Sequence, residues 1–389
     1  MNYMADVQPL RGIRYANETI GDLAQVVTPP YDVITREAQA TYYARNPYNF
    51  IRLELGQESA KDTTLNNRYT RAATTFAEWR KNGVLRQDIT PDFYLYQQLF
   101  THNNQSYTRT SLLARVRLEP WSAKVVLPHE YTMTKPKDDR LQPITDPAQV
   151  VFFQDFFAER QLYIADGHHR YETALNYREE IRELRRHIND DDAVNFVLMA
   201  LIDVDDPGLL VLPTHRLLFG LSSEALGSLN SQQLAQYFTV QQLDTTMKSD
   251  AMLAVLASSG EKQPSLVVVT RDQNWLLLLN ESGRRRMMES GHSAAWNALD
   301  VAVAHTLVLE ALLGIRAEDV TSGTYIRYTR DAEQALEVVR SGDAQAALLL
   351  NATRVRQICE VAQADDRMPQ KSTYFYPKLM SGLVMNPLW

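Results

Sequence analysis

The chain has 389 residues, of which 45% are hydrophobic and 22% charged, and its net charge is -7 at pH 7. This composition is typical of a globular protein with more than one hydrophobic core. The acidic balance provides no general attraction for nucleic acid or anionic lipid, so an anion would need a local site. With one cysteine, Cys359, and no apolar leader or membrane-length run, we expect a cytoplasmic protein without disulfides or a membrane span.

The first part of the chain mixes short strands with helices. TPPYDVI (28–34) predicts a proline-stiffened turn in which Asp32 has a structural role, and FIRLEL (50–55) alternates like a strand. The periodic segment 65–83 predicts a helix that stops at Gly83. Residues 92–100 and 107–118 flank a polar turn and predict a β-hairpin.

The rest of the chain continues this irregular mixture. Residues 125–143, rich in proline and charge, predict a loop, and QLYIA (161–165) predicts a buried strand that leads into a helix ending near His187. Further strands, a hairpin over 264–280 and helices follow in no strict alternation. Such a pattern favours an α+β fold class over an alternating α/β fold.

YIADGHHRYETAL (163–175) places an acid, a glycine and three basic side chains at the predicted helix start. Unpaired N–H groups and the positive end of the helix dipole form an anion site there, and Gly167 permits close approach of a ligand. His168, His169 and Arg170 add donors suited to phosphate. Asp166 would repel that anion unless Mg²⁺ lies between them or the carboxylate accepts a hydroxyl proton. The alternative is that Asp166 only caps the helix and the histidines are solvated.

Several stretches together resemble a known family. They are VVTPPYDVI, ARNPYNFIRLEL, VLPHEYT, PKDDRL, LYIADGHHRYETAL, DDPGLLVLPTHR and RMPQKSTYFYPKLMSGLVMNP, and they extend over nearly the whole chain. The chain is similar to the family called domain of unknown function 1015, and its 163–175 stretch resembles the phosphate-binding signature of the ParB/sulfiredoxin-like superfamily. The resemblance implies a ParB/sulfiredoxin-like nucleotide-binding core at 115–220, with additional mixed α/β regions at 1–114 and 221–389.

The better-understood relatives implied by this resemblance are free-serine kinases that use ADP or ATP, CTP-binding partition proteins and sulfiredoxin. His168 stands where sulfiredoxin requires a cysteine, so we do not expect sulfinic acid chemistry. The segment between Arg140 and Leu162 is also shorter than the family pattern.

The resemblance further implies which residues act. In the kinase relatives a Glu on an early segment acts beside the Asp of the signature. We carry this role to Glu130, as the base that takes a hydroxyl proton. The alternative is that Glu130 is a surface residue beside a turn proline. The expected catalytic residues are Asp166, Glu130 and His168, with Asp166 as the metal ligand. The expected nucleotide-binding residues are Gly167, His168, His169, Arg170, His129 and Lys371.

We therefore expect a Mg²⁺-dependent kinase that transfers phosphate from ADP or ATP to a small hydroxylated metabolite such as serine. The alternative is a nucleotide-binding switch or adaptor with little or no turnover, which would need only the Gly-His-His-Arg cradle. A zinc hydrolase is less consistent with the sequence, because HExxH and paired-cysteine spacings are missing. No basic stripe indicates a nucleic-acid partner, and the oligomeric state stays open.

Overall fold

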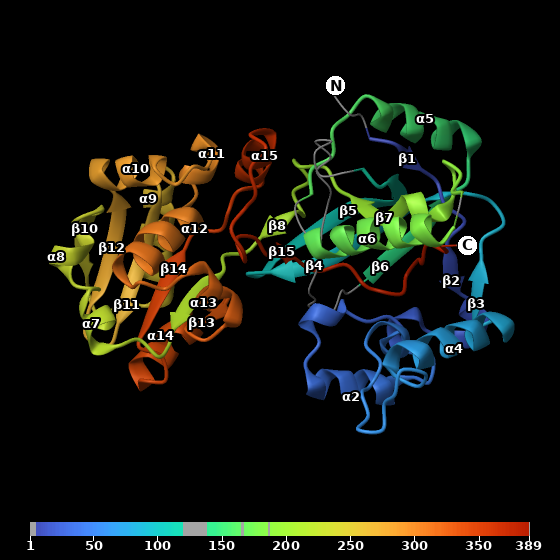
Figure 1. Cartoon of the computed structure of the whole chain (residues 1–389), viewed down its shortest axis with the longest axis horizontal. Helices are drawn as coiled ribbons and strands as arrows, with labels where there is room; N and C mark the ends of the chain where they lie inside the picture. Colours follow the sequence, from blue (N-terminus) through green and yellow to red (C-terminus); the bar gives the residue numbers. More distant parts are fainter. Residues whose placement is uncertain (1–4, 120–137, 165–166, 186, 389) are drawn as a thin grey trace. The chain divides into compact units, whose positions relative to one another are not determined.

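The computed structural model describes residues 5–119, 138–164, 167–185 and 187–388. The chain divides into two compact units, Met1–Leu210 with Phe375–Trp389, and Val211–Tyr374 (Figure 1). The second unit is therefore inserted into the first. These units differ from the three predicted regions 1–114, 115–220 and 221–389, because the 114/115 boundary falls inside one strand, β5 (Gln105–Arg117).

The first unit is built on an antiparallel sheet with β5 at its centre. Its other strands are β1 (Val7–Gln8), β4 (Phe93–His102), β6 (Asp138–Ile144) and β7 (Phe196–Leu201). The strand order is β1-β5-β4-β6, and β7 also pairs with β5. The predicted hairpin is confirmed as β4 and β5, joined through Asn103 and Asn104 at φ 48° and 60°, the left-handed values that a tight two-residue hairpin turn requires.

Strand β6 corrects the predicted loop over 125–143. Residues 138–144 pair with β4, while residues 125–137 lie outside the described part of the chain. Leu141 and Ile144 each pack against a hydrophobic cluster of this unit. Burial of these two apolar side chains, despite their charged neighbours, explains why the segment joins the sheet.

Helix α6 (His168–Leu184) packs on the sheet. Its residues Tyr171 and Leu175 share a hydrophobic cluster with Val116 of β5 and Met199 of β7, and Figure 1 shows the helix running beside these strands. The helix starts at His168, as predicted. The strand predicted over 161–165 is wrong as a regular element, since the described residues 161–164 contain only a bridge at Ile164. Ile164 is buried in the same cluster, so the apolar pattern there reflects burial.

Residues 50–55 also differ from the prediction, because they form a one-turn helix, α3 (Ile51–Glu54), and no strand. Ile51 is fully buried, and Arg52 donates to the carbonyls of Tyr43 and Pro47, each at 2.8 Å. The short apolar run is compatible with the spacing of a helix and with that of a strand, and these tertiary contacts decide in favour of the helix. Neighbouring helices are α1 (Asn17–Ile20), α2 (Arg36–Arg45), α4 (Arg68–Lys81) and α5 (Pro147–Ala158).

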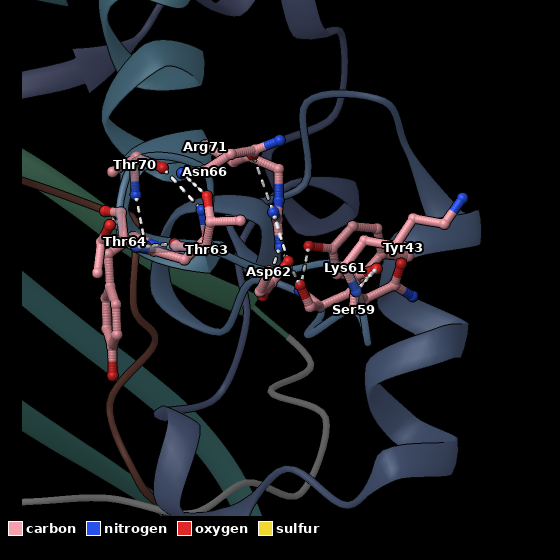
Figure 2. Close-up of polar contacts among 12 residues, drawn as sticks. Tyr43, Ser59, Lys61, Asp62, Thr63, Thr64, Asn66, Thr70 and Arg71 are labelled. Carbon is pink, nitrogen blue, oxygen red and sulfur yellow. Dashed lines mark hydrogen bonds and ion pairs between the residues drawn. The ribbon is translucent and has the colours of Figure 1, made fainter.

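A polar network holds the loop between α3 and α4 (Figure 2). Arg71 donates two hydrogen bonds to Asp62, at 2.8 and 3.1 Å, and a third to the carbonyl of Gln57 at 2.8 Å. The N–H of Gln57 in turn donates to the hydroxyl of Tyr43 at 3.0 Å. The network thereby fixes the chain directly after α3, the helix that carries Glu54.

The second unit is a six-stranded antiparallel sheet of order β10-β12-β11-β14-β9-β13. Its strands are β10 (Phe238–Leu243), β12 (Asn274–Leu279), β11 (Ser265–Thr270), β14 (Ala346–Leu350), β9 (His215–Leu218) and β13 (Ile326–Thr329). The predicted hairpin over 264–280 is confirmed as β11 and β12.

Helices cover both faces of this second sheet. On one face α9 (Ser249–Gly260) and α14 (Ala332–Ser341) pack through Met252 and Leu336. On the other, α12 (Asp300–Val303) and the π-helix Ala304–Leu312 pack through Val301 and Leu307. Because both faces are buried, the central strands are continuous apolar runs.

Shorter elements complete both units. They are β2 (Ile13–Tyr15), β3 (Leu85–Gln87), β8 (Leu210–Val211), β15 (Phe375–Tyr376), α7 (Ser223–Gly227), α8 (Ser231–Leu234), α10 (Glu281–Met288), α11 (Ala294–Asn297), α13 (Ala317–Ser322) and α15 (Val355–Gln363). The sheets are antiparallel, and helices and strands do not alternate regularly along the chain, which confirms the α+β class. Among the helices of the described residues, none combines the length and apolar character needed to cross a bilayer.

Candidate functional site

A cleft of about 570 Å³ lies in the first unit, bounded by α6, the sheet and the returning segment 379–388. Its walls are mainly apolar and include Tyr177 and Phe196. Gly167, Arg170 and Ser381 add polar groups to the lining. This volume, with apolar walls and few polar groups, is typical of small-molecule sites.

The N-terminus of α6 contributes to this lining. Gly167 is the N-cap residue, with a left-handed backbone at φ 88°, and it makes no side-chain capping bond. The alternative in which Asp166 only caps the helix stays open, because Asp166 lies outside the described residues. Glycine adopts this conformation without the Cβ penalty, and the first N–H groups of a 17-residue helix have no intrahelical partner. Helix starts of this kind are common binding sites for anions in proteins.

The carboxylate of Glu54, from α3, is not among the described lining residues, but it accepts a hydrogen bond from one of them, Ser381. Its Oε1 accepts hydrogen bonds from the hydroxyl of Ser381 at 2.8 Å and from the N–H of Tyr31 at 3.3 Å, and its Oε2 accepts one from the hydroxyl of Thr28 at 3.2 Å. Burial raises the pKa of Glu54 from 4.5 to about 7, although these three donors and the charge of Arg170 oppose the increase. A carboxyl with a pKa near neutrality can accept and release a proton at physiological pH.

Arg170, in the first turn of α6, carries the positive charge that opposes the rise in the pKa of Glu54 caused by burial. The surrounding protein lowers the pKa of its guanidinium, and the charges of Asp32, Glu54 and Tyr31 offset part of that decrease. The side chain keeps contact with solvent, because it lies on the wall of an open cleft. Arg170 therefore remains protonated at neutral pH, and a guanidinium is well suited to bind phosphate.

The predicted site residues lie in different parts of the structure. Gly167 and Arg170 line the cleft, whereas His168 and His169 are exposed and are not among the described lining residues. His169 pairs through Nδ1 with Glu172, at 3.4 Å. Asp166, Glu130 and His129 lie outside the described residues, and Lys371 is an exposed residue of the second unit. The roles assigned to all of these side chains stay predictions.

The described residues contain no group of three or more His, Cys, Asp or Glu side chains that could hold a metal ion. Mg²⁺ is commonly held by one or two carboxylates together with substrate phosphates, so its site need not show such a group. Among the described residues, the carboxylates of Asp32 and Glu54 act on the charge of Arg170. Glu54 already accepts three hydrogen bonds, which suits a base better than a metal ligand.

Sequence reasoning missed Glu54, although the segment that contains it contributed to the family resemblance. Its partners Thr28 and Ser381 are 26 and 327 positions away, so no local pattern shows them. The available signal was the position of Glu54 within the short apolar segment FIRLEL. Burying a carboxylate there without a partner would cost free energy, so an acid in such a segment indicates a specific partner. Asp32, which we expected to stabilise the turn at residues 28–34, also lies within electrostatic range of Arg170.

The fold and cleft define a two-unit α+β protein with a candidate anion-binding site in its first unit. The family model described as Protein of unknown function (DUF1015) matches residues 7–144 and 140–302, more than half of the chain. The chain therefore belongs to this family, as its sequence motifs predict. None of the curated proteins matches the sequence.

Solved structures show only distant similarity. A free serine kinase in complex with AMP is 12% identical, with a TM-score of 0.32 and coverage of 56% of this chain and 69% of the kinase chain. A mutant of that kinase with AMP has a TM-score of 0.33 at 12% identity, over 56% of this chain and 70% of its own. A conserved hypothetical protein from Pyrococcus furiosus is 12% identical, with a TM-score of 0.33 over 58% and 77% of the two chains.

Proposed function

We propose that the cleft of the first unit binds a nucleotide and catalyses transfer of its terminal phosphate to a small hydroxylated metabolite such as serine. The observation that carries this proposal is the position of Glu54, a carboxyl with a pKa of about 7, within electrostatic range of Arg170 at the start of α6. Phosphoryl transfer needs positioned cations, backbone donors and a base more than it needs covalent chemistry by the protein.

Each group has a defined role in this proposal. The N–H groups that follow Gly167 and the guanidinium of Arg170 bind the phosphates, and the apolar walls near Tyr177 and Phe196 accept the nucleoside. Glu54 takes the proton of the attacking hydroxyl, the role that the sequence assigned to Glu130. A nucleotide switch without turnover would not need a carboxyl with a pKa near neutrality, so Glu54 favours the kinase over that alternative.

The finer expectations from the sequence belong to the same proposal. They are a ParB/sulfiredoxin-like core around residues 115–220, ADP or ATP as the donor, and a cytoplasmic location. They also include a Mg²⁺ ion held by Asp166 and the phosphates, which would neutralise charge on the phosphoryl group.

The direct test is calorimetry and thermal-shift measurement with ATP, ADP and AMP in the presence of Mg²⁺, followed by a product assay with serine and other small alcohols. A nucleotide that binds only the native protein raises its melting temperature. We expect Arg170→Ala to weaken nucleotide affinity by about ten- to a hundredfold, as for the loss of one charge-assisted hydrogen bond.

The matched control is Arg182→Ala. Arg182 is an exposed arginine of the same helix, and it forms an ion pair with Glu179 at 2.9 Å. This variant should bind nucleotide as the unmodified protein does. The proposal fails if no nucleotide stabilises the protein. Binding without product formation for any acceptor would instead favour the switch.

A further inference from the structure

The hydroxyl of Ser381 lies beside the candidate base Glu54 and on the lining of the cleft. Its Oγ is 2.8 Å from Glu54 Oε1, within the range for proton transfer to a general base. Ser381 also lines the cleft together with Gly167 and Arg170. The chain itself thus presents an alcohol to the base and to the candidate phosphate site.

The backbone around Ser381 holds this hydroxyl in place. Its N–H donates to the carbonyl of Thr28 at 2.8 Å, and the N–H of Thr28 donates back to the carbonyl of Ser381 at 3.2 Å. The next residue, Gly382, has φ 93°, and a Cβ there would lie 2.8 Å from the ring of Phe50. Such close fixation removes much of the entropic cost of bringing a nucleophile to its target.

A second hydroxyl near Glu54 does not share these properties. Thr28 Oγ1 lies 3.2 Å from Glu54 Oε2, but Thr28 is fully buried and is not among the described residues that line the cleft. Ser381 is only partly buried and reaches the cleft. Of these two alcohols, only Ser381 lines the cleft.

We propose that Ser381 is a self-phosphorylation site, which accepts the terminal phosphate of a nucleoside triphosphate bound in the cleft. This inference rests on the proposed function. Ser381 Oγ forms a bond to the terminal phosphorus, and the bond from that phosphorus to its bridging oxygen breaks. The hydroxyl proton passes to Glu54 Oε1, and the products are phosphoserine and the nucleoside diphosphate. The positive charge of Arg170 stabilises the phosphoryl group during transfer.

The test uses the full chain with ATP and Mg²⁺, followed by trypsin and mass spectrometry. Cleavage after Lys378 releases the peptide LMSGLVMNPLW (379–389), in which Ser381 is the only hydroxyl-bearing residue. We expect one phosphate on this peptide, formed with a rate constant independent of protein concentration, as for a reaction within one chain. Glu54→Gln should slow its formation by about 10²- to 10⁴-fold, the usual contribution of a general base.

Ser381→Ala should abolish the modification, whereas Ser106→Ala, at an exposed serine of the same unit, should leave it unchanged. Calorimetry with ATP on the same samples separates the two proposals. If ATP binds and a small alcohol is phosphorylated while the 379–389 peptide stays unmodified, the inference is overturned and the proposed function stands. If ATP does not bind, both fall. An undiminished rate of phosphorylation in Glu54→Gln, or a rate constant that rises with protein concentration, would also overturn the inference.

Discussion

Glu54→Gln tests the electrostatics of the site without any assumption about its substrate. A glutamine has the shape of a protonated glutamate, and it can keep the three hydrogen bonds of Glu54. Its oxygen accepts from Tyr31 and Ser381, and its amide donates to Thr28 Oγ1, whose hydroxyl reverses direction. The substitution therefore removes the charge and leaves the local contacts in place.

The expected magnitude follows from the pKa of Glu54. In the unfolded chain this pKa is near 4.5 and in the folded protein about 7, so the folded state binds the proton more tightly. The stability from this group is fully present below pH 4.5 and is lost as the pH rises through 7. The complete difference corresponds to roughly 3 kcal/mol. Because Glu54 is only partly buried, we expect screening by solvent to reduce this to about 1 to 3 kcal/mol.

We expect Glu54→Gln to match the unmodified protein in stability near pH 4 and to exceed it by about 1 to 3 kcal/mol at pH 8. The measurement is urea unfolding at several pH values, with hydrogen exchange of β4 and β5 amides reporting the first unit separately. Glu58→Gln is the control, because Glu58 is an exposed partner of Arg68 with 71% of its side chain accessible. A stability difference that does not change with pH would refute the raised pKa of Glu54.

Two further substitutions test the starts of α6 and α4. Asp166→Asn keeps the shape of the side chain and removes its charge. Turnover should collapse in a product assay while the melting temperature changes little. Unchanged turnover would exclude a catalytic role for Asp166. Asn67→Ala should destabilise the protein by about 1 kcal/mol in urea titration, because Asn67 forms a capping box with Thr70 at the start of α4, and an unaffected midpoint would contradict this account.

Periodic and turn-bounded elements could be predicted from sequence. The start of α6 at His168 and the hairpin of β4 and β5 depend on local signals, a glycine before a helical pattern and a polar turn between two alternating runs. The family membership could also be inferred, because its motifs are spread along the chain.

Elements decided by tertiary contacts could not be predicted in the same way. FIRLEL is too short for its apolar spacing to distinguish helix from strand. The hydrogen bonds of Arg52 to Tyr43 of α2 and to Pro47, which follows that helix, decide in favour of the helix. The same limit applies to the site. Glu54 becomes a candidate base only once Ser381 and Arg170 lie near it, and these residues come from three distant segments.

The inserted position of the second unit has a consequence for synthesis of the protein. A ribosome that has translated residues 1–374 has already produced Glu54 and α6, but it has not yet supplied Ser381 or the wall at 379–388. The nascent chain therefore cannot assemble the cleft until the whole second unit has been translated, although domains generally fold as they emerge. A chain released early, within residues 211–374, lacks one wall of the site.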